Sequence, residues 1–176
     1  MTQIHLIPAA ACHMAAARAL YNEAFPPEER RPWDTIVNPV SAAGPHLYIA
    51  ADADGRNYGF VTIWTFPKFI YVEHLAVDAA ARGAGIGASV LDGIKKLHPK
   101  PIALEVEPPH SDNPMAARRI GFYRRCGFDL LDFDYIQPPY AKNLPSVPLF
   151  LMATPGAPDP SEIAETLHKE VYGVGV

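Results

Sequence analysis

The chain has 176 residues, 19 of them proline, and 15 lysines and arginines against 19 aspartates and glutamates give a formal charge of −4. Hydrophobic residues make up 49% and charged residues 19%, which is enough apolar material for a core and argues against a disordered chain. This length predicts one domain. The acidic balance argues against a nucleic-acid partner, because binding to phosphates needs clustered cations.

The sequence also argues against a membrane protein, a disulfide-stabilised protein and a metal-binding protein. No segment approaches the roughly 18 apolar residues that span a bilayer, and the first residues lack a charged and then apolar leader pattern. We therefore expect a cytoplasmic protein with no membrane partner. Cys12 and Cys126 lie far apart, and no two of the seven histidines are three or four residues apart. Neither a disulfide framework nor a metal site is predicted.

Prolines are rare inside helices and central strands, so the proline-free intervals locate the regular structure. Residues at helical spacing predict a helix over 11–24, stopped by the prolines that follow. A charged, exposed loop or short helix is expected over 25–33. Two strands at 46–51 and 59–66 are joined by a turn that contains Asp and Gly, which predicts an antiparallel hairpin.

A third strand is expected at 69–77, which is rich in aromatic and β-branched residues. Apolar residues along one face then predict a helix over 86–97. An apolar strand follows at 101–106. The succession of strand, helix and strand favours parallel pairing of 69–77 with 101–106.

Asn113 can cap a helix that begins at Pro114 and stops at Gly127. Two closing strands are expected at 128–135 and 148–153, and then a short amphipathic helix in the tail. The order α, β, β, β, α, β, α, β, β predicts a mixed α/β (α+β) layer, not repeated β-α units.

A glycine-dense turn separates the third strand from the next helix. Its residues are Arg82, Gly83, Ala84, Gly85, Ile86 and Gly87. Glycines let a backbone approach a ligand, and the free amides of a first helical turn attract anions such as pyrophosphate, although a flexible turn without a ligand is an alternative. The spacing also fits a dinucleotide-binding fingerprint ending at Ala88, with Glu105 about 20 residues further on. Asp78 to Arg82 lie between this strand and the first glycine, however, and the chain lacks the further β-α units of a doubly wound sheet.

Two motifs carry a resemblance to a known family. The segment RGAGIG at 82–87, after the strand ending Leu75-Ala76-Val77, resembles the R-x-x-G-x-G/A motif of the GCN5-related N-acetyltransferase (GNAT) superfamily. The segment FYRRCGF at 122–128 resembles the helix ending L/F-Y-x-x-x-G-F of the same family. The resemblance covers roughly 46–135.

The resemblance implies a GNAT-like single domain with a mixed, mostly antiparallel sheet flanked by helices. An N-acetyltransferase domain over 1–154 would precede a tail at 155–176 that carries the short helix. Strands 69–77 and 101–106 would splay apart, and acetyl-CoA, with CoA as its product, would occupy the gap.

In this family pantetheine pairs with the main chain of the strand end, and the amides of the turn hold the pyrophosphate. The implied cofactor-binding residues are Leu75, Ala76, Val77, Arg82, Gly83, Ala84, Gly85, Ile86, Gly87 and Ala88. Many members carry Asn seven residues before the motif tyrosine and Ala four residues before it. This chain has Ala116 and Arg119 there, so a contact from that Asn to pantetheine is not expected.

Acetyl transfer to an amine requires a base, because an alkyl ammonium has a pKa of about 10.4. Glu73, two residues before the strand end, is the first candidate, and Glu105, Glu107 and His74 stay open as alternatives. Strand alternation would place Glu73 and His74 on opposite faces. Tyr123 matches the tyrosine with which the family often protonates the departing CoA thiolate.

The resemblance places the acceptor between 25–33 and the segment 135–140. The candidate acceptor residues are Glu28, Glu29, Trp33, Tyr135 and Tyr140, together with Arg30, Arg31 and Gln137. The charged run at 28–31 is equally typical of a solvated helix face. We expect direct transfer from acetyl-CoA to a primary amine of a small molecule or peptide in a ternary complex, by a monomer or homodimer. A non-catalytic acyl-CoA-binding or sensing module is the alternative, and a dinucleotide-binding protein is less favoured.

Overall fold

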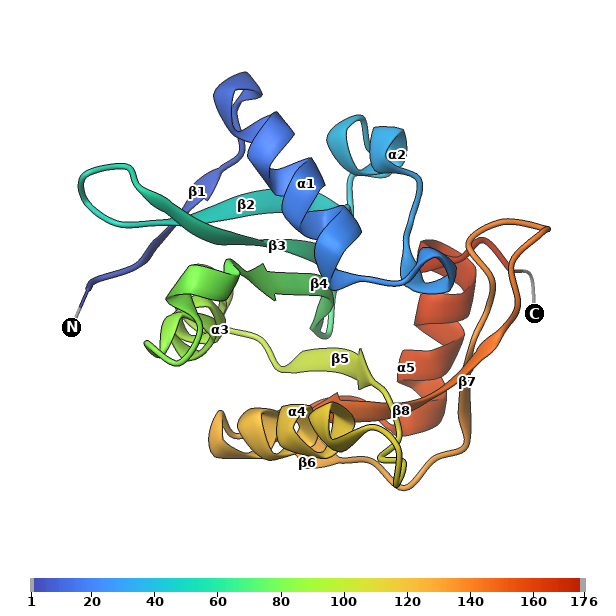
Figure 1. The fold of residues 1–176 in the computed structure, drawn as a ribbon. Helices are drawn as coiled ribbons and strands as arrows, with labels where there is room; N and C mark the ends of the chain where they lie inside the picture. The colour runs from blue at the N-terminus through green and yellow to red at the C-terminus, as the bar shows by residue number, and fades with distance from the viewer. Residues whose placement is uncertain (1, 175–176) are drawn as a thin grey trace.

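One sheet organises the chain, in the strand order β1-β2-β3-β4-β5-β8-β6, with β7 paired to β8 (Figure 1). The computed structural model describes residues 2–174. The strands are β1 (His5–Pro8), β2 (His46–Ala51), β3 (Asn57–Thr65), β4 (Ile70–Val77), β5 (Ile102–Val106), β6 (Asp129–Leu130), β7 (Tyr135–Gln137) and β8 (Val147–Ala153). Among these strands only β4 and β5 pair in parallel. The predicted mixed, mostly antiparallel sheet is confirmed, and its single parallel pair excludes a doubly wound sheet.

Helices cover both faces of the sheet. They are α1 (Met14–Ala24), α2 (Trp33–Val37), α3 (Ile86–Leu97), α4 (Pro114–Arg125) and α5 (Pro160–Thr166), with short helical turns at Ala11–His13, Pro27–Glu29, Ala79–Ala81 and Leu167–Val171. Across residues 2–174, every helix is too short or too polar to cross a bilayer.

Alternation along the strands divides the core into two faces. Val61, Val72 and Leu104 pack with the apolar sides of α3 and α4. Their chain neighbours project to the other face: Phe60 packs with α1, whereas Tyr71 packs with α5. The tail therefore belongs to the same core as the sheet, because its Ile163, Leu167 and Val171 are buried there.

Strand β4 bends at Glu73. In its ladder with β3 the register passes from Val72 opposite Ile63 to His74 opposite Thr62, so Glu73 is the extra residue of a β-bulge. The parallel ladder with β5 ends at Val72 opposite Leu104, while β4 continues to Val77. The predicted parallel pairing is confirmed, and the two strands separate beyond it.

The predicted strand at 128–135 is wrong as a continuous element. Leu130 pairs with Met152 and Tyr135 pairs with Leu149, so five steps along this segment face only three along β8. A regular ladder cannot absorb the two extra residues, and the chain leaves the sheet between β6 and β7. The structure also has two elements that were not expected, β1 and α2.

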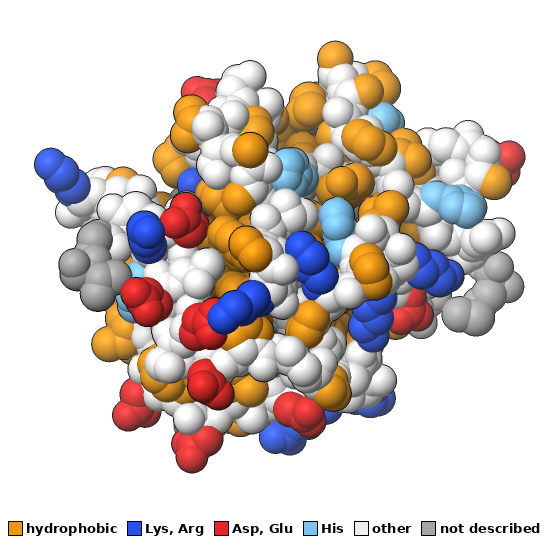
Figure 2. Space-filling view, turned by 180° about the vertical axis from the view of Figure 1, so that it is seen from behind, with side chains coloured by type: hydrophobic (Ala, Val, Ile, Leu, Met, Phe, Trp, Pro, Cys, Tyr) orange, Lys and Arg blue, Asp and Glu red, His pale blue; other side chains and the backbone are white. Residues whose placement is uncertain are grey.

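The molecular surface mixes all residue classes. Figure 2, seen from behind the view of Figure 1, shows Lys and Arg side chains and Asp and Glu side chains spread among hydrophobic ones. Scattered hydrophobic side chains are normal on a folded surface and do not by themselves indicate a partner.

Gly59 provides a test of the β3–β4 contact. A Cβ at Gly59 would lie 2.2 Å from the carbonyl oxygen of Ala76, which is backbone and cannot rotate away. We expect Gly59→Ala to lower the free energy of unfolding by at least about 2 kcal/mol, measured by urea denaturation. Gly121→Ala is the control, because its Cβ meets only the mobile end of Arg125 and the helix interior favours Ala. Equal effects of both substitutions would contradict the packing described.

Candidate active site

A cavity of about 390 Å³ lies where β4 and β5 separate. Segments from five parts of the chain meet around it. The lining comprises 72–77 of β4, 104–107 at the end of β5, Glu23, Ala24, Phe25 and Glu29 before α2, Arg82, Met115, Arg119 and Tyr123 near α4, and Gln137, Tyr140 and Leu149. The strand gap is therefore the floor of a chamber that the loop before α2 and the chain after β7 enclose.

A second cavity of about 400 Å³ adjoins the first at the glycine turn. Gly83, Gly85, Ile86 and Gly87 line it. Gly83 and Gly85 have φ of 83° and 77°, which side chains rarely adopt, and Gly85 caps α3 without a side-chain acceptor. The first amides of α3 are therefore available to an anion.

The predicted cofactor residues divide between these cavities. Leu75, Val77 and Arg82 line both, and Ala76 lines the first. Ala84 and Ala88 line neither. Tyr123 lines both cavities and is 8% exposed, so its ring stands at their junction.

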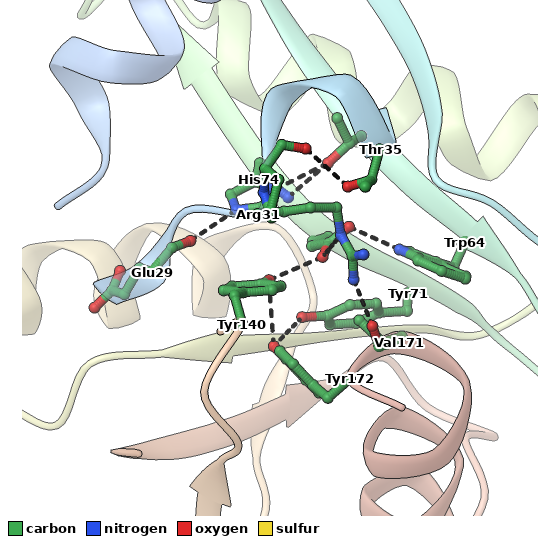
Figure 3. Close-up of polar contacts among 12 residues, drawn as sticks. Glu29, Arg31, Thr35, Trp64, Tyr71, His74, Tyr140, Val171 and Tyr172 are labelled. Atoms are coloured by element: carbon green, nitrogen blue, oxygen red, sulfur yellow. Dashed lines mark hydrogen bonds and ion pairs between the residues drawn. The ribbon is translucent and has the colours of Figure 1, made fainter. Parts of the chain in front are cut away.

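The carboxylate of Glu73 is enclosed by donors, and its side chain is 0% exposed (Figure 3). Oε1 accepts hydrogen bonds of 2.8 Å from Arg31 Nε and from the Tyr140 hydroxyl, and Oε2 accepts one of 2.7 Å from Trp64 Nε1. Burial alone would raise the pKa of Glu73, but the charge of Arg31 and the hydrogen bonds from Trp64 and Arg31 outweigh it and the pKa is lowered. An enclosed carboxylate with a lowered pKa is a weak base, which argues against direct proton abstraction by Glu73.

Arg31 connects the loop before α2 to the tail. Its guanidinium pairs with Glu73, donates to the carbonyl of Val171 and lies 5.2 Å from the Trp64 ring centre and 5.1 Å from that of Tyr140. Burial acts to lower the pKa of Arg31, but the charge of Glu73 outweighs it and the pKa is raised. The cation is therefore fixed in place.

His74 lies on the same face as Glu73, so the expected placement on opposite faces is wrong. Glu73 bonds to Trp64 and His74 to Thr62, and these partners project from one face of β3. The bulge at Glu73 breaks the alternation. Burial lowers the pKa of His74. The neutral ring donates through Nε2 to the carbonyl of Glu29 at 3.0 Å, because a carbonyl can only accept, and Nδ1 is left to accept from Thr62.

Three tyrosine hydroxyls surround the carboxylate of Glu105. Tyr71 and Tyr172 donate at 2.8 Å to Oε2, and Tyr135 donates to Oε1. Burial raises the pKa of Glu105 to about 7, against the opposite effect of these hydrogen bonds. Both oxygens are occupied, and one of the donors belongs to the tail.

Glu29 and Glu107 face each other in the cavity. Asn113 Nδ2 donates to Glu107 Oε2 at 3.1 Å. Burial raises the pKa of Glu29 to about 7, the neighbouring charge of Glu107 adds to this, and Arg119 acts in the opposite direction. This end of the cavity holds more carboxylates than cations.

The predicted acceptor residues have different locations. Glu29, Gln137 and Tyr140 line the cavity, whereas Glu28, Arg30, Arg31, Trp33 and Tyr135 do not. Trp33 packs its ring 5.5 Å from Tyr21 instead. Sequence reasoning missed Trp64, Tyr71 and Tyr172, which bond to the buried carboxylates from outside the expected acceptor segments.

Comparison with known proteins identifies the family to which this fold belongs. Residues 44–130 match the family model of the acetyltransferase (GNAT) domain. The solved structure of a GNAT-family protein from Bacteroides thetaiotaomicron is 37% identical, with a TM-score of 0.85 over 97% of this chain and 99% of the other. The chain belongs to the GNAT family.

Two further matches of this GNAT protein cover a smaller share of the chain. YjbC of Bacillus subtilis, assigned to the acetyltransferases, is 43% identical over 63 residues, which cover 36% of this chain and 32% of YjbC. The chain thus matches about a third of that relative. Naa50 of Arabidopsis thaliana, solved with the bisubstrate analogue CoA-Ac-MVNAL, is 22% identical with a TM-score of 0.61, over 86% of this chain and 98% of the other, and shares the fold.

Removal of the Arg31 side chain tests the buried ion pair. Arg31→Met leaves Glu73 buried without its cation, and we expect the free energy of unfolding at pH 7 to fall by about 3–5 kcal/mol. In the native protein the lowered pKa of Glu73 contributes stability that is lost as pH falls through that pKa. In Arg31→Met burial dominates and raises the pKa, so the deficit should shrink on acidification.

Urea denaturation at pH 7 and pH 5 measures both effects. The double variant Arg31→Met/Glu73→Gln should recover much of the loss. Lys68→Met is the control, because its pair with Glu162 is exposed and should contribute less than about 1 kcal/mol. Equal stability of Arg31→Met and the native protein at pH 7 would contradict the assigned role.

Proposed function

We propose that this protein is an acetyl-CoA-dependent N-acetyltransferase that moves the acetyl group directly to a primary amine of a small molecule or peptide in a ternary complex. The observation that supports this most is the position of Tyr123, which lines both the glycine-turn cavity and the cavity between β4 and β5. A molecule that extends from one cavity into the other passes this residue.

The two cavities fit the two ends of acetyl-CoA. The uncapped start of α3 provides backbone amides for the pyrophosphate, with Arg82 beside it. Beyond Val72 the described pairing of β4 with β5 has ended, so main chain at Leu75, Ala76 and Val77 can pair with the amide groups of pantetheine. When bound there, acetyl-CoA supplies an activated acetyl thioester.

The acceptor end favours a cation. Glu23, Glu29, Glu105 and Glu107 line the cavity, against the two cations Arg82 and Arg119, while Arg31 is already paired with Glu73. Phe25 and Tyr140 add aromatic surface. A protonated primary amine meets favourable charge here and must lose a proton before it attacks the thioester carbonyl.

Tyr123 supplies the proton that the leaving sulfur gains. Burial raises the pKa of Tyr123 to about 12, with Arg119 acting in the opposite direction, so the phenol stays protonated throughout the neutral range. As the amine nitrogen bonds to the carbonyl carbon and the carbon–sulfur bond breaks, the hydroxyl donates to the sulfur that leaves. CoA departs as the thiol.

Cofactor binding is the first test. We expect isothermal titration calorimetry to show one acetyl-CoA site per chain, and thiol release to require both acetyl-CoA and an amine from a panel of mono-, di- and polyamines and peptide N-termini. Binding without transfer across the panel would instead support an acyl-CoA-binding module. Failure of acetyl-CoA and CoA to bind would contradict the proposal.

The acid role of Tyr123 predicts a specific kinetic change. Tyr123→Phe should lower kcat by about 10- to 1000-fold with an unchanged Kd for acetyl-CoA, because only the donor to the leaving sulfur is lost. Tyr48→Phe in β2, outside both cavities, should leave kcat unaltered. Since the pKa of Tyr123 is about 12, no limb of the pH profile below pH 10 should depend on this residue. Native kcat in Tyr123→Phe would remove it from the mechanism.

A further inference from the structure

Residues 28–31, here called the strap, cross the acceptor end of the strand gap, and buried side chains hold three of their carbonyls. Gln137, His74 and Tyr21 are each no more than 2% exposed. The bonds run from Gln137 Nε2 to the Glu28 carbonyl at 3.5 Å, from His74 Nε2 to that of Glu29 at 3.0 Å, and from the Tyr21 hydroxyl to that of Arg31 at 3.0 Å. Figure 3 shows Glu29, His74 and Arg31 together.

Burying a polar side chain costs free energy unless it is hydrogen-bonded. The hydrogen-bond partners of buried polar side chains therefore indicate which segment those side chains hold in place. Within residues 2–174 the polar residues other than tyrosine that are buried over backbone and side chain together are Thr62, His74 and Gln137. His74 and Gln137 bond to the strap, and Thr62 bonds to His74. All three therefore support one short segment of main chain.

Glu29 is the strap residue that lines the cavity. Two residues further on, Arg31 closes the strap against β4 through its ion pair with Glu73. These anchors hold the main chain at Glu29, whose side chain lines the cavity together with that of Glu107.

We propose that Glu29 is the catalytic base, and that it takes the proton that the acceptor amine loses. The inference rests on the proposed N-acetyltransferase activity. The ammonium gives its proton to the carboxylate, which becomes a carboxylic acid. The freed lone pair of the nitrogen forms the bond to the acetyl carbon, and Tyr123 provides the proton for the sulfur as the carbon–sulfur bond breaks.

Three of the other candidates have hydrogen-bond partners on the atoms that would accept the proton, and Glu107 accepts from Asn113 on one oxygen. Glu73 accepts from Arg31, Trp64 and Tyr140, and both oxygens of Glu105 accept from tyrosines. His74 already carries its proton on the nitrogen that bonds to the strap. The side-chain partner of the Glu29 carboxyl is that of Glu107, and in the described part of the chain no arginine, lysine, hydroxyl or amide side chain donates to Glu29.

The surroundings of Glu29 suit a base that works near neutral pH. Burial and the charge of Glu107 raise its pKa to about 7, Glu105 adds to this, and Arg119 opposes it. Glu23 and Arg82 line the same cavity, and the buried neutral ring of His74 lies under the Glu29 carbonyl. A base with a pKa near the working pH is ionised and still accepts a proton readily.

The titration of Glu29 can be measured on the native protein without any acceptor. In protein labelled with ¹³C at the glutamate carboxyl carbons, we expect the resonance that is lost in Glu29→Gln to titrate near pH 7. Glu107→Gln should lower that midpoint, because it removes the facing charge. A midpoint near the ordinary glutamate value of about 4.5 would overturn the inference, even if the protein transfers acetyl groups.

Kinetics test the role once an amine substrate is found. Glu29→Gln should lower kcat by about 100-fold or more at pH 7 and abolish the pH limb near 7, with an unchanged Kd for acetyl-CoA. Glu29→Asp should restore part of the rate. Asp34→Asn, an exposed carboxylate in α2, is the matched control and should keep both rate and limb. A Glu29→Gln variant that keeps the native rate and limb would overturn the inference. Absence of transfer by the native protein would instead count against the proposed function, which the titration does not test.

Discussion

The end of the parallel ladder between β4 and β5 determines the rest of the site. Pairing stops at Val72 and Leu104, and the next residue of β4, Glu73, is the extra residue of a bulge. A bulge bends its strand and interrupts side-chain alternation. The bend opens the cavity and frees main chain at the strand end. The interruption turns two consecutive polar side chains, those of Glu73 and His74, to one buried face. The bulge at Glu73 thus opens the cavity and also buries two polar side chains that need hydrogen-bond partners.

The need of these buried side chains for partners explains why segments far apart in the sequence meet at this site. A buried carboxylate or imidazole without partners is strongly destabilising, so each must be met by donors or acceptors from elsewhere. Arg31 comes from the strap and Tyr140 from the chain after β7, and both reach Glu73. His74 is a donor where Glu73 is an acceptor: its Nε2 donates to the strap carbonyl of Glu29. The same contacts that satisfy the buried polar groups of the bulge therefore build this wall of the cavity.

Local patterns in the sequence predicted much of this fold. Proline spacing and apolar periodicity located β2 to β5, α3 and α4, and the glycine turn located the start of α3 at Ile86. The bulge escaped prediction because nothing in the run Val72-Glu73-His74 differs from a regular strand; only the register with β3 reveals it. The partners of the carboxylates escaped for a related reason: Arg31 and Glu73 are 42 residues apart, and Tyr172 and Glu105 are 67 apart. Pairings at such separations follow from the fold and leave no local signal.

The carboxylates of the site show why residue type and motif position could not assign the base. Glu73 meets a guanidinium and its pKa falls. Glu105 meets only neutral phenols, and burial raises its pKa to about 7. Glu29 has a similar pKa, but it lines the cavity and its side-chain partner is another carboxyl group, that of Glu107. Opposed environments give identical side chains different chemistry. Glu73 lies in β4 itself, yet its partners suit it to hold the strap, and the strap in turn presents the carboxylate of Glu29, which we propose as the proton acceptor.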